Sequence, residues 1–139
     1  MLALTIDPVK SFMSKLLKEG VFDEFYVKSA AIDTFVRFEI HAVADAPALW
    51  ADVRSFAFDI IKSGGTPKTM RIILGSNADK HGIDGATALY INIHFEGGKV
   101  LLTTGVSYNG FHMDKSGEKL WNAAVLGFLD AAGINYIQS

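Results

Sequence analysis

Four side chains of the types used in acid–base catalysis occur in the C-terminal half of the sequence: Tyr90, His94, His112 and Asp114. Histidine takes up and releases protons near neutral pH, and a carboxylate or phenol can orient it or share its proton. Tyr90 and His94 fall on a predicted strand, whereas His112 and Asp114 precede a predicted helix. Folding must bring these two segments together before the four residues can form one catalytic site.

The histidines show no spacing that is typical of a metal site. Zinc sites on helices commonly use two histidines at positions i and i+4, and no pair of histidines in this sequence has that spacing. Asn77, Asp79 and His81 alternate before a glycine, as in a calcium loop, but the twelfth position holds Ala88 where such a loop needs a glutamate. We therefore expect a polar turn in this segment, and neither a metal nor a cofactor.

The stretch "GGTPKT", which begins at Gly64, has the composition of a phosphate-binding loop. Such a loop runs from a strand into a helix, because free amides at the helix N-terminus bind the anion. Here the apolar stripe that includes Ile60 and Ile61 predicts a helix before the glycines, and "MRIIL" from Met70 predicts a strand after them. We therefore predict that the glycines end a helix and bind no nucleotide.

Nucleophile motifs are missing from the sequence. The chain has no cysteine, which excludes disulfides, thiolate metal sites and a cysteine nucleophile. Ser107 in "GVSYNG" does not match the Gly-x-Ser-x-Gly pattern of a nucleophile elbow, and no helix follows it directly. These observations favour a function without catalysis.

Apolar periodicity predicts a single α+β domain over residues 1–139, in which three main helices pack against an antiparallel-rich sheet. The predicted order of elements is β-α-β-β-α-β-β-β-α. The predicted strands cover residues 2–6, about 25–32, 36–40 and 70–74, and a hairpin over 87–108. The predicted helices begin near Asp7-Pro8, Asp45 to Pro47 and Asp114 to Ser116, and they end before Gly20, Gly64 and Gly133.

The hairpin is the clearest predicted element, because Gly97-Gly98 suits a two-residue turn. This turn pairs residues of one apolar face: Phe95 with Val100, Ile93 with Leu102, and Ile91 with Thr104. The other face, which we expect to be partly solvated, carries Tyr90, Asn92, His94, Leu101 and Thr103.

Charge and hydropathy narrow the classes of function. The formal charge is −2, whereas a duplex-binding module is normally basic, so we do not expect binding to nucleic acid. The candidates for such contacts are Lys10, Lys15 and Lys18 of the first predicted helix, whose solvated face explains them equally well. No apolar segment reaches the ~18 residues of a membrane span, and the N-terminus lacks the pattern of a secretory signal, so we expect a cytoplasmic protein.

The sequence as a whole resembles an uncharacterised bacterial family, a domain of unknown function found mostly in clostridia and related gut bacteria. The matching motifs include "FMSKLL" from Phe12, "FDEF" from Phe22, "IDTF" from Ile32 and "TTGVS" from Thr103. The resemblance covers nearly the whole chain. It implies no activity, cofactor or catalytic residue.

The order of elements is also similar to that of one domain of a DNA sliding clamp, in which helices line a basic central hole. The first predicted helix, with its three lysines, would suit that role. The second predicted helix, which carries Asp52 and Asp59, and the negative net charge would not. A likeness in topology alone is weak support for a function.

We favour a non-enzymatic interaction or ligand-binding module that forms a homo-oligomer, since a mean hydropathy of +0.24 is high for a soluble monomer. One alternative is an enzyme whose site assembles around His94 and His112. Another is a DNA-clamp-like protein. The sequence identifies neither the ligand or substrate nor the oligomeric state nor the order of strands in the sheet.

Overall fold

The computed structural model describes residues 1–43, 48–108, 110 and 115–138. The helices in this part of the chain are α1 (Val9–Leu17), α2 (Trp50–Gly64), α3 (Ser116–Ala131) and the short 3-10 helix η1 (Asp79–His81). The strands are β1 (Ala3–Ile6), β2 (Tyr26–Asp33), β3 (Arg37–His41), β4 (Thr69–Ser76), β5 (Ala86–Glu96), β6 (Lys99–Tyr108) and β7 (Tyr136–Gln138).

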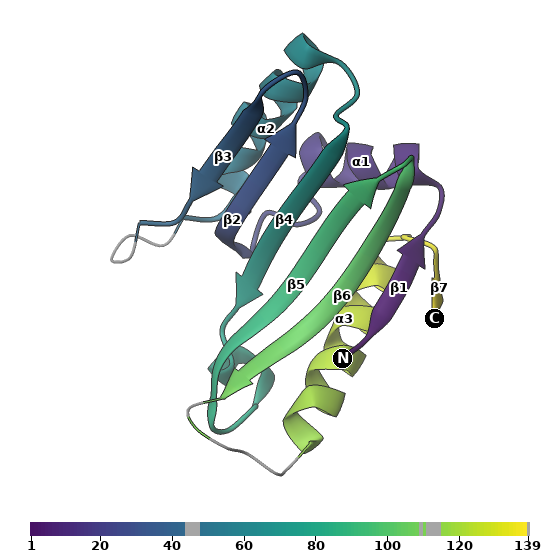
Figure 1. Ribbon diagram of the computed structural model, residues 1–139. Coiled ribbons are helices and arrows are strands. Elements are labelled where there is room, and N and C mark those ends of the chain that lie inside the picture. Colours follow the sequence, from purple (N-terminus) through teal and green to yellow (C-terminus); the bar gives the residue numbers. More distant parts are fainter. Residues whose placement is uncertain (44–47, 109, 111–114, 139) are drawn as a thin grey trace.

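The strands form one antiparallel sheet in the order β3-β2-β4-β5-β6-β1-β7 (Figure 1). The chain leaves β1 through α1 and enters β2 on the far side of β4, β5 and β6. The terminal strands β1 and β7 therefore lie together at one edge, and the β2–β3 hairpin forms the other. The predicted α+β class and order of elements are confirmed, and the three-residue strand β7 follows the last predicted helix.

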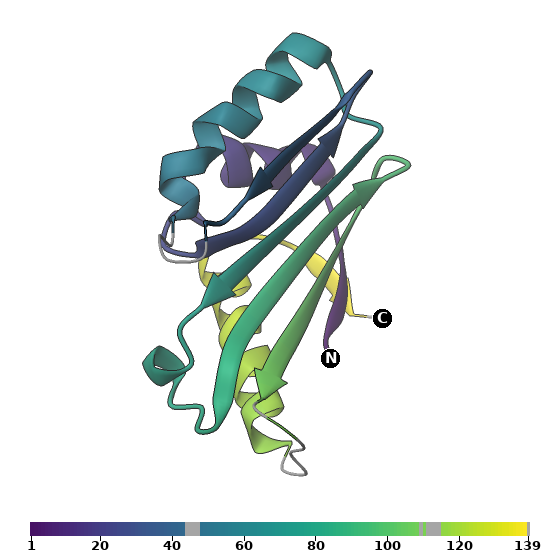
Figure 2. The same ribbon diagram turned by 60° about the vertical axis from the view of Figure 1, so that its left-hand side comes forward.

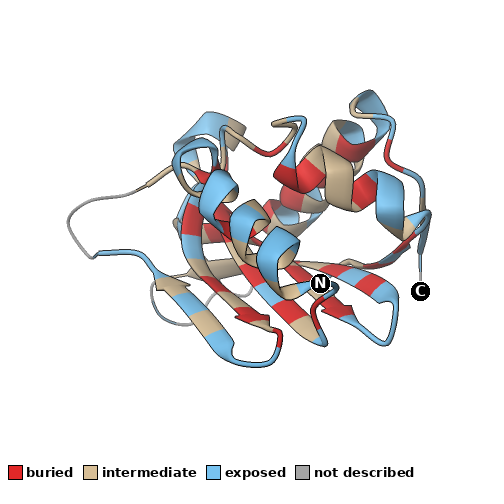
Figure 3. Cartoon of the chain, turned by 90° about the horizontal axis from the view of Figure 1, so that it is seen from above, coloured by how far each residue is buried: buried red, intermediate tan, exposed pale blue. Residues whose placement is uncertain are grey.

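All three helices cover one face of the sheet and leave the opposite face uncovered (Figure 2, Figure 3). Successive side chains of a strand point to opposite faces, so alternate residues of the central strands are buried under the helices. On β4 and β5 these fully buried residues are Met70, Ile72, Leu74, Leu89, Ile91 and Ile93. The core thus lies between one sheet and one layer of helices.

The β5–β6 hairpin has the register predicted from its sequence. The pairs are Phe95 with Val100, Ile93 with Leu102, and Ile91 with Thr104. Gly97 and Gly98 have φ values of 59° and 74°, in the left-handed region that two-residue hairpin turns need and that glycine enters without steric strain. Turn chemistry and apolar alternation therefore specify the same pairing.

Gly64 is the last residue of α2 and Gly65 caps the helix, so the glycine pair ends it as predicted. The amide of Gly65 donates to the carbonyl of Ile61 at 2.8 Å, and the chain then enters β4 at Thr69. The carbonyl end of the helix dipole lies at these glycines, and it repels anions. The phosphate-loop interpretation is therefore excluded. The predicted start of α2 near Asp45 and Pro47 falls outside the described residues.

Two side chains of α2 hold the C-terminal end of α1. The indole N–H of Trp50 donates to the carbonyl of Leu16 at 2.8 Å, and the guanidinium of Arg54 donates to the carbonyls of Leu17 and Lys18 at 3.2 Å. The last carbonyls of a helix have no partner within the helix, so these bonds satisfy polar groups that folding would otherwise leave unpaired. These bonds also hold the end of α1 against α2, and thereby position the start of the segment that follows α1.

Candidate functional site

The structure places Tyr90 and His94 on the uncovered face of β5 but does not bring them together. They are four residues apart on one strand, so their Cα atoms are about 13 Å apart. His94 pairs in register with Arg71 of β4, and its Nε2 lies 3.8 Å from the carboxylate of Glu96. His112 and Asp114 lie outside the described residues, so a catalytic site around His94 and His112 stays a prediction.

The three lysines of α1 differ in their surroundings. Lys10 is exposed, whereas Lys15 is half-buried and lines a small cavity of about 120 Å³ beside Gly133. The ammonium of Lys18 lies 5.2 Å from the centre of the Phe58 ring on α2, within the range of a cation–π contact. Nucleic-acid contact through these lysines and a DNA-clamp-like role both stay predictions.

A pocket of about 420 Å³ lies among α3, η1 and the segment that follows α1. We call it the His81 pocket, since His81 forms part of its polar wall. A volume of this size is typical of small-molecule sites, and most of such sites have apolar walls. The apolar lining residues here are Val21, Phe25, Trp121, Ala124, Val125 and Phe128.

The aromatic walls of the His81 pocket are held by contacts outside it. Trp121 is 1% exposed, and its indole N–H donates to the carbonyl of Tyr90 at 2.9 Å. The rings of Phe25 and Phe128 meet edge to face at 5.1 Å between centroids. The pocket therefore has rigid aromatic surfaces contributed by α3 and by the segment after α1.

The polar wall comes from the turn that leaves β4. The side-chain oxygen of Asn77 accepts a hydrogen bond from the amide of Asp79 at 2.8 Å, which starts the short helix η1. This turn brings His81 back to the end of the strand, where its Nε2 shares a hydrogen bond of 3.0 Å with Ser76 Oγ. The polar turn predicted for this segment is confirmed, and it positions a histidine.

His81 also contacts the aromatic wall. Its ring lies edge to face with Trp121 at 5.0 Å between centroids. Burial lowers the pKa of His81, and the nearby charge of Lys80 lowers it further. His81 is therefore neutral at physiological pH and can donate or accept a hydrogen bond.

The charges at the rim of the His81 pocket are paired with one another. Glu24 and Lys80 approach to 3.8 Å across its mouth, and both are well exposed. Asp23 forms a 2.7 Å ion pair with Arg54 of α2. The walls inside this rim thus present aromatic rings, a hydroxyl group and a neutral imidazole.

We expect the free energy of unfolding to fall as the pH drops through the histidine range, and part of this fall to disappear in His81→Gln. Because the folded-state pKa of His81 is lowered from its ordinary value of 6.5, the unfolded chain binds the proton first. The stability that neutral His81 contributes is complete above the unfolded-state pKa and is lost as pH falls toward the folded-state pKa.

Urea unfolding across about pH 5 to 8, the range in which histidine titrates, measures this difference. His41→Gln is the matched control, because the His41 side chain is 68% exposed. We expect the control to follow the wild-type profile. Parallel profiles for wild type and His81→Gln would contradict the prediction.

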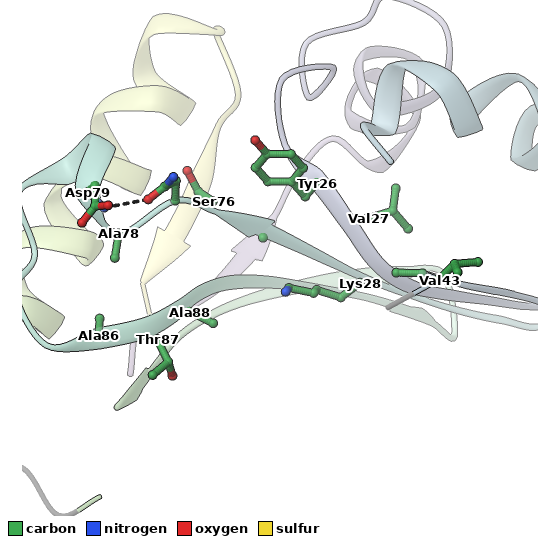
Figure 4. Close-up of a pocket in the computed structure, with 13 residues that line it drawn as sticks. Tyr26, Val27, Lys28, Val43, Ser76, Ala78, Asp79, Ala86, Thr87 and Ala88 are labelled. Atoms are coloured by element: carbon green, nitrogen blue, oxygen red, sulfur yellow. Dashed lines mark hydrogen bonds between the residues drawn. The ribbon is translucent and has the colours of Figure 1, made fainter. Parts of the chain in front are cut away.

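A second hollow, of about 580 Å³, lies on the other side of the β4 end (Figure 4). Lys28 crosses it, with its ammonium 5.9 Å from the centre of the Tyr90 ring. A Cβ at Gly75 would lie 2.9 Å from Cε of Lys28, so the side chain rests directly on the glycine. Ser76 lines both this hollow and the His81 pocket. The hollow is open and polar, which makes it the weaker candidate for an apolar ligand.

Among the described residues, no group of three or more histidine, aspartate and glutamate side chains could hold a metal ion. None of the helices in this part of the chain is both long and apolar enough to cross a membrane.

In the sequence His81 stands out only as part of a calcium-like loop, and no pattern there predicts its pocket. Ser76 and His81 are five residues apart, a separation that is not diagnostic of a site. Trp121 comes forty residues after His81, and its apolar spacing predicts only a core position. The sequence feature that could have indicated this site is a histidine in a short polar turn directly after a buried strand.

The comparisons with known proteins give a family and no activity. No curated protein and no solved structure matches the chain significantly. Residues 15–137 match DUF5721, which is described as a family of unknown function. The chain belongs to this family.

Proposed function

We propose that this chain is a non-enzymatic module that binds a small, uncharged and largely apolar molecule in the His81 pocket, and that it self-associates. The observation that carries the binding proposal is the composition of the pocket. Aromatic walls surround a single polar wall formed by Ser76 and His81, an arrangement typical of small-molecule sites.

The chemistry of the walls defines the ligand class. An apolar body fits against the half-buried rings of Phe25 and Phe128, beside the buried ring of Trp121, and removes the exposed part of the two phenylalanine rings from water. A hydroxyl or carbonyl group fits Ser76 and His81, because both side chains can donate and accept hydrogen bonds. A charged ligand would lose its hydration against these apolar walls, which costs more free energy than placing an uncharged ligand there.

Titration with benzyl alcohol, followed by ¹⁵N–¹H correlation spectra, tests the proposal. The chain has two tryptophans: Trp121 lines the pocket, whereas Trp50 is buried and its indole N–H donates to the carbonyl of Leu16. We expect the Trp121 indole signal to shift saturably and the Trp50 signal to stay in place. Native mass spectrometry of protein purified from its own host would then identify the natural ligand.

Two substitutions one residue apart on α3 provide the matched control. Ala124 lines the His81 pocket, whereas Ala123 is exposed. We expect Ala124→Phe to fill the pocket and abolish the saturable shift, and Ala123→Phe to retain it. Equal binding by both variants, or no saturable shift in the wild type, would refute the His81 pocket as the site for this ligand class.

An enzyme is the second candidate, and the Ser76–His81 contact is the observation that favours it. A serine hydroxyl within hydrogen-bond distance of an imidazole nitrogen has the geometry of an activated nucleophile, and Ser76 Oγ lies 3.0 Å from Nε2 of His81. In the described part of the chain, no carboxylate hydrogen-bonds His81 as the third group of a triad. Hydrolysis of p-nitrophenyl acetate that Ser76→Ala abolishes would favour this candidate.

Self-association is supported by apolar side chains left in solvent. Phe35 is 80% exposed and Phe56 is 64% exposed, and apolar surface that gathers into a patch marks contacts between proteins. Sedimentation velocity tests self-association, because it distinguishes a particle with the mass of one chain from a particle with the mass of two or more. The cytoplasmic location expected from the sequence stays a prediction.

A further inference from the structure

β3 is the outermost strand at one end of the sheet, and its free edge is available for pairing. In the described part of the chain β3 pairs only with β2. A strand at an edge presents unpaired amides and carbonyls, which makes it a template for another strand. At the opposite end of the sheet, the corresponding strand β7 is only three residues long.

The backbone bonds already made by β3 determine which of its groups are free. The amide of Thr34 donates to the carbonyl of Val36 at 3.0 Å, and the amide of Ala42 donates to the carbonyl of Lys28 at 3.3 Å. Hydrogen-bonded residues alternate along an antiparallel strand. The even-numbered residues of β3 therefore bond to β2, and the odd-numbered ones, which are Arg37, Glu39 and His41, direct their amides and carbonyls outward.

One flank of α2 adds apolar surface beside this edge. Arg54 and Phe58 lie on the flank that faces α1, where they contact the end of that helix. Helical spacing puts Phe56 and Ile60 together on the opposite flank. Ile60 also lines a shallow hollow with Phe38 of β3, so this flank borders the free edge.

We propose that a second copy of this chain pairs with β3, strand antiparallel to strand, about a twofold axis at Phe38. The proposal rests on the self-association proposed above and names the surface that mediates it. The two sheets then join into one continuous sheet. The Phe56–Ile60 flanks of the two α2 helices meet over the paired strands and are removed from water.

Charge favours this register over the two neighbouring ones. With the axis at Phe38, Arg37 of each copy lies opposite Glu39 of the other. The outward amides and carbonyls of these two residues then form the backbone hydrogen bonds between the copies. An axis at Arg37 or at Glu39 would instead place like charges opposite each other, which destabilises a cross-strand pair. Opposite charges therefore meet twice in the proposed register.

The side chains around the axis agree with the same register. Phe38 meets its own symmetry mate on the helix-covered face, and Val36, which is 48% exposed, meets Ile40. On the uncovered face Arg37 is held by Asp33 through two hydrogen bonds of 2.6 and 3.0 Å. Its Nη1 already lies 3.7 Å from the carboxylate of Glu39 on the same strand, and a guanidinium has five N–H donors, so Arg37 can also donate to Glu39 of the other copy.

Charge reversal at the two facing positions tests the proposal by sedimentation velocity. We expect the wild-type chain of 15.1 kDa to sediment as a dimer. Glu39→Arg alone and Arg37→Glu alone each create two like-charge pairs, so we expect each variant to dimerise about tenfold more weakly. Mixing the two variants in equal amounts restores both opposite-charge pairs, and we expect a heterodimer of wild-type affinity.

Glu96→Arg is the matched control, because Glu96 is exposed and lies on β5, away from the edge. Circular dichroism of each variant shows whether the fold is retained. A monomeric wild type would overturn self-association together with this surface. A dimer that neither single reversal weakens would overturn the β3 surface alone, and a mixture that fails to recover would overturn the register.

Discussion

We expect Trp50→Ala to lower the free energy of unfolding by about 4 kcal/mol, the loss typical of a buried tryptophan. Trp50 is 0% exposed, so the substitution removes a large apolar side chain from the core and leaves a cavity. A domain of this size is stabilised by only about 5–15 kcal/mol in total. The variant should therefore lose a large part of the stability of the fold.

Part of this loss is specific to the end of α1. The indole N–H of Trp50 donates to the buried carbonyl of Leu16, and no group of an alanine side chain can replace it. A buried polar group left without a partner costs about 1–3 kcal/mol. Trp50→Phe, which keeps an aromatic ring but has no donor, should fall between the wild type and Trp50→Ala.

Urea unfolding followed by far-ultraviolet circular dichroism measures both variants without relying on tryptophan fluorescence. Leu120→Ala is the control, because Leu120 is 50% exposed on α3 and should change the free energy of unfolding by at most about 0.5 kcal/mol. A Trp50→Ala loss no larger than that of the control would show that α2 does not depend on this contact.

Local patterns predicted the elements of this fold well. The β5–β6 register follows from apolar alternation and a two-glycine turn, and both signals lie within residues adjacent in the sequence. The end of α2 at the glycine pair follows in the same way from an apolar stripe and a C-terminal glycine. In each case the energy that selects the structure comes from neighbouring residues.

The arrangement of the elements depends on contacts between distant residues. β1 pairs with β6 and β7, at the opposite side of the sheet from where its successor β2 lies. Apolar alternation within Ala3–Ile6 shows which face is buried but carries no information on the partner strand. β7 has only three residues, too few for a periodicity to indicate a strand.

The His81 pocket was missed for the same physical reason. Its polar wall is local, but its aromatic walls come from α3 and from the segment after α1. Tyr90 and His94 have side chains suited to acid–base chemistry and share one face of β5. Four residues of extended strand separate their Cα atoms by about 13 Å, so the strand itself keeps the two side chains apart.

Trp121 connects the stability of the fold to the chemistry of the His81 pocket, and we expect Trp121→Ala to change both. The free energy of unfolding should fall by about 4 kcal/mol, since Trp121 is 1% exposed and packs between α3 and the sheet. Trp121→Phe keeps an aromatic ring in the wall, but it loses the donor to the carbonyl of Tyr90 and part of the buried volume. Its expected loss is about 2 kcal/mol.

The pKa of His81 distinguishes the role of Trp121 in the pocket from its role in the core. Burial is the main cause of the lowered pKa, and the indole ring lies against the imidazole. Trp121→Ala opens that side to water, so the pKa of His81 should rise toward its ordinary value, whereas Trp121→Phe should leave it low. Titration of the His81 ring protons by NMR, with conditions chosen so that each variant is folded, measures this shift. An unchanged pKa in folded Trp121→Ala would mean that Trp121 does not shield His81 from water, and the aromatic wall would then lose its part in the proposed binding site.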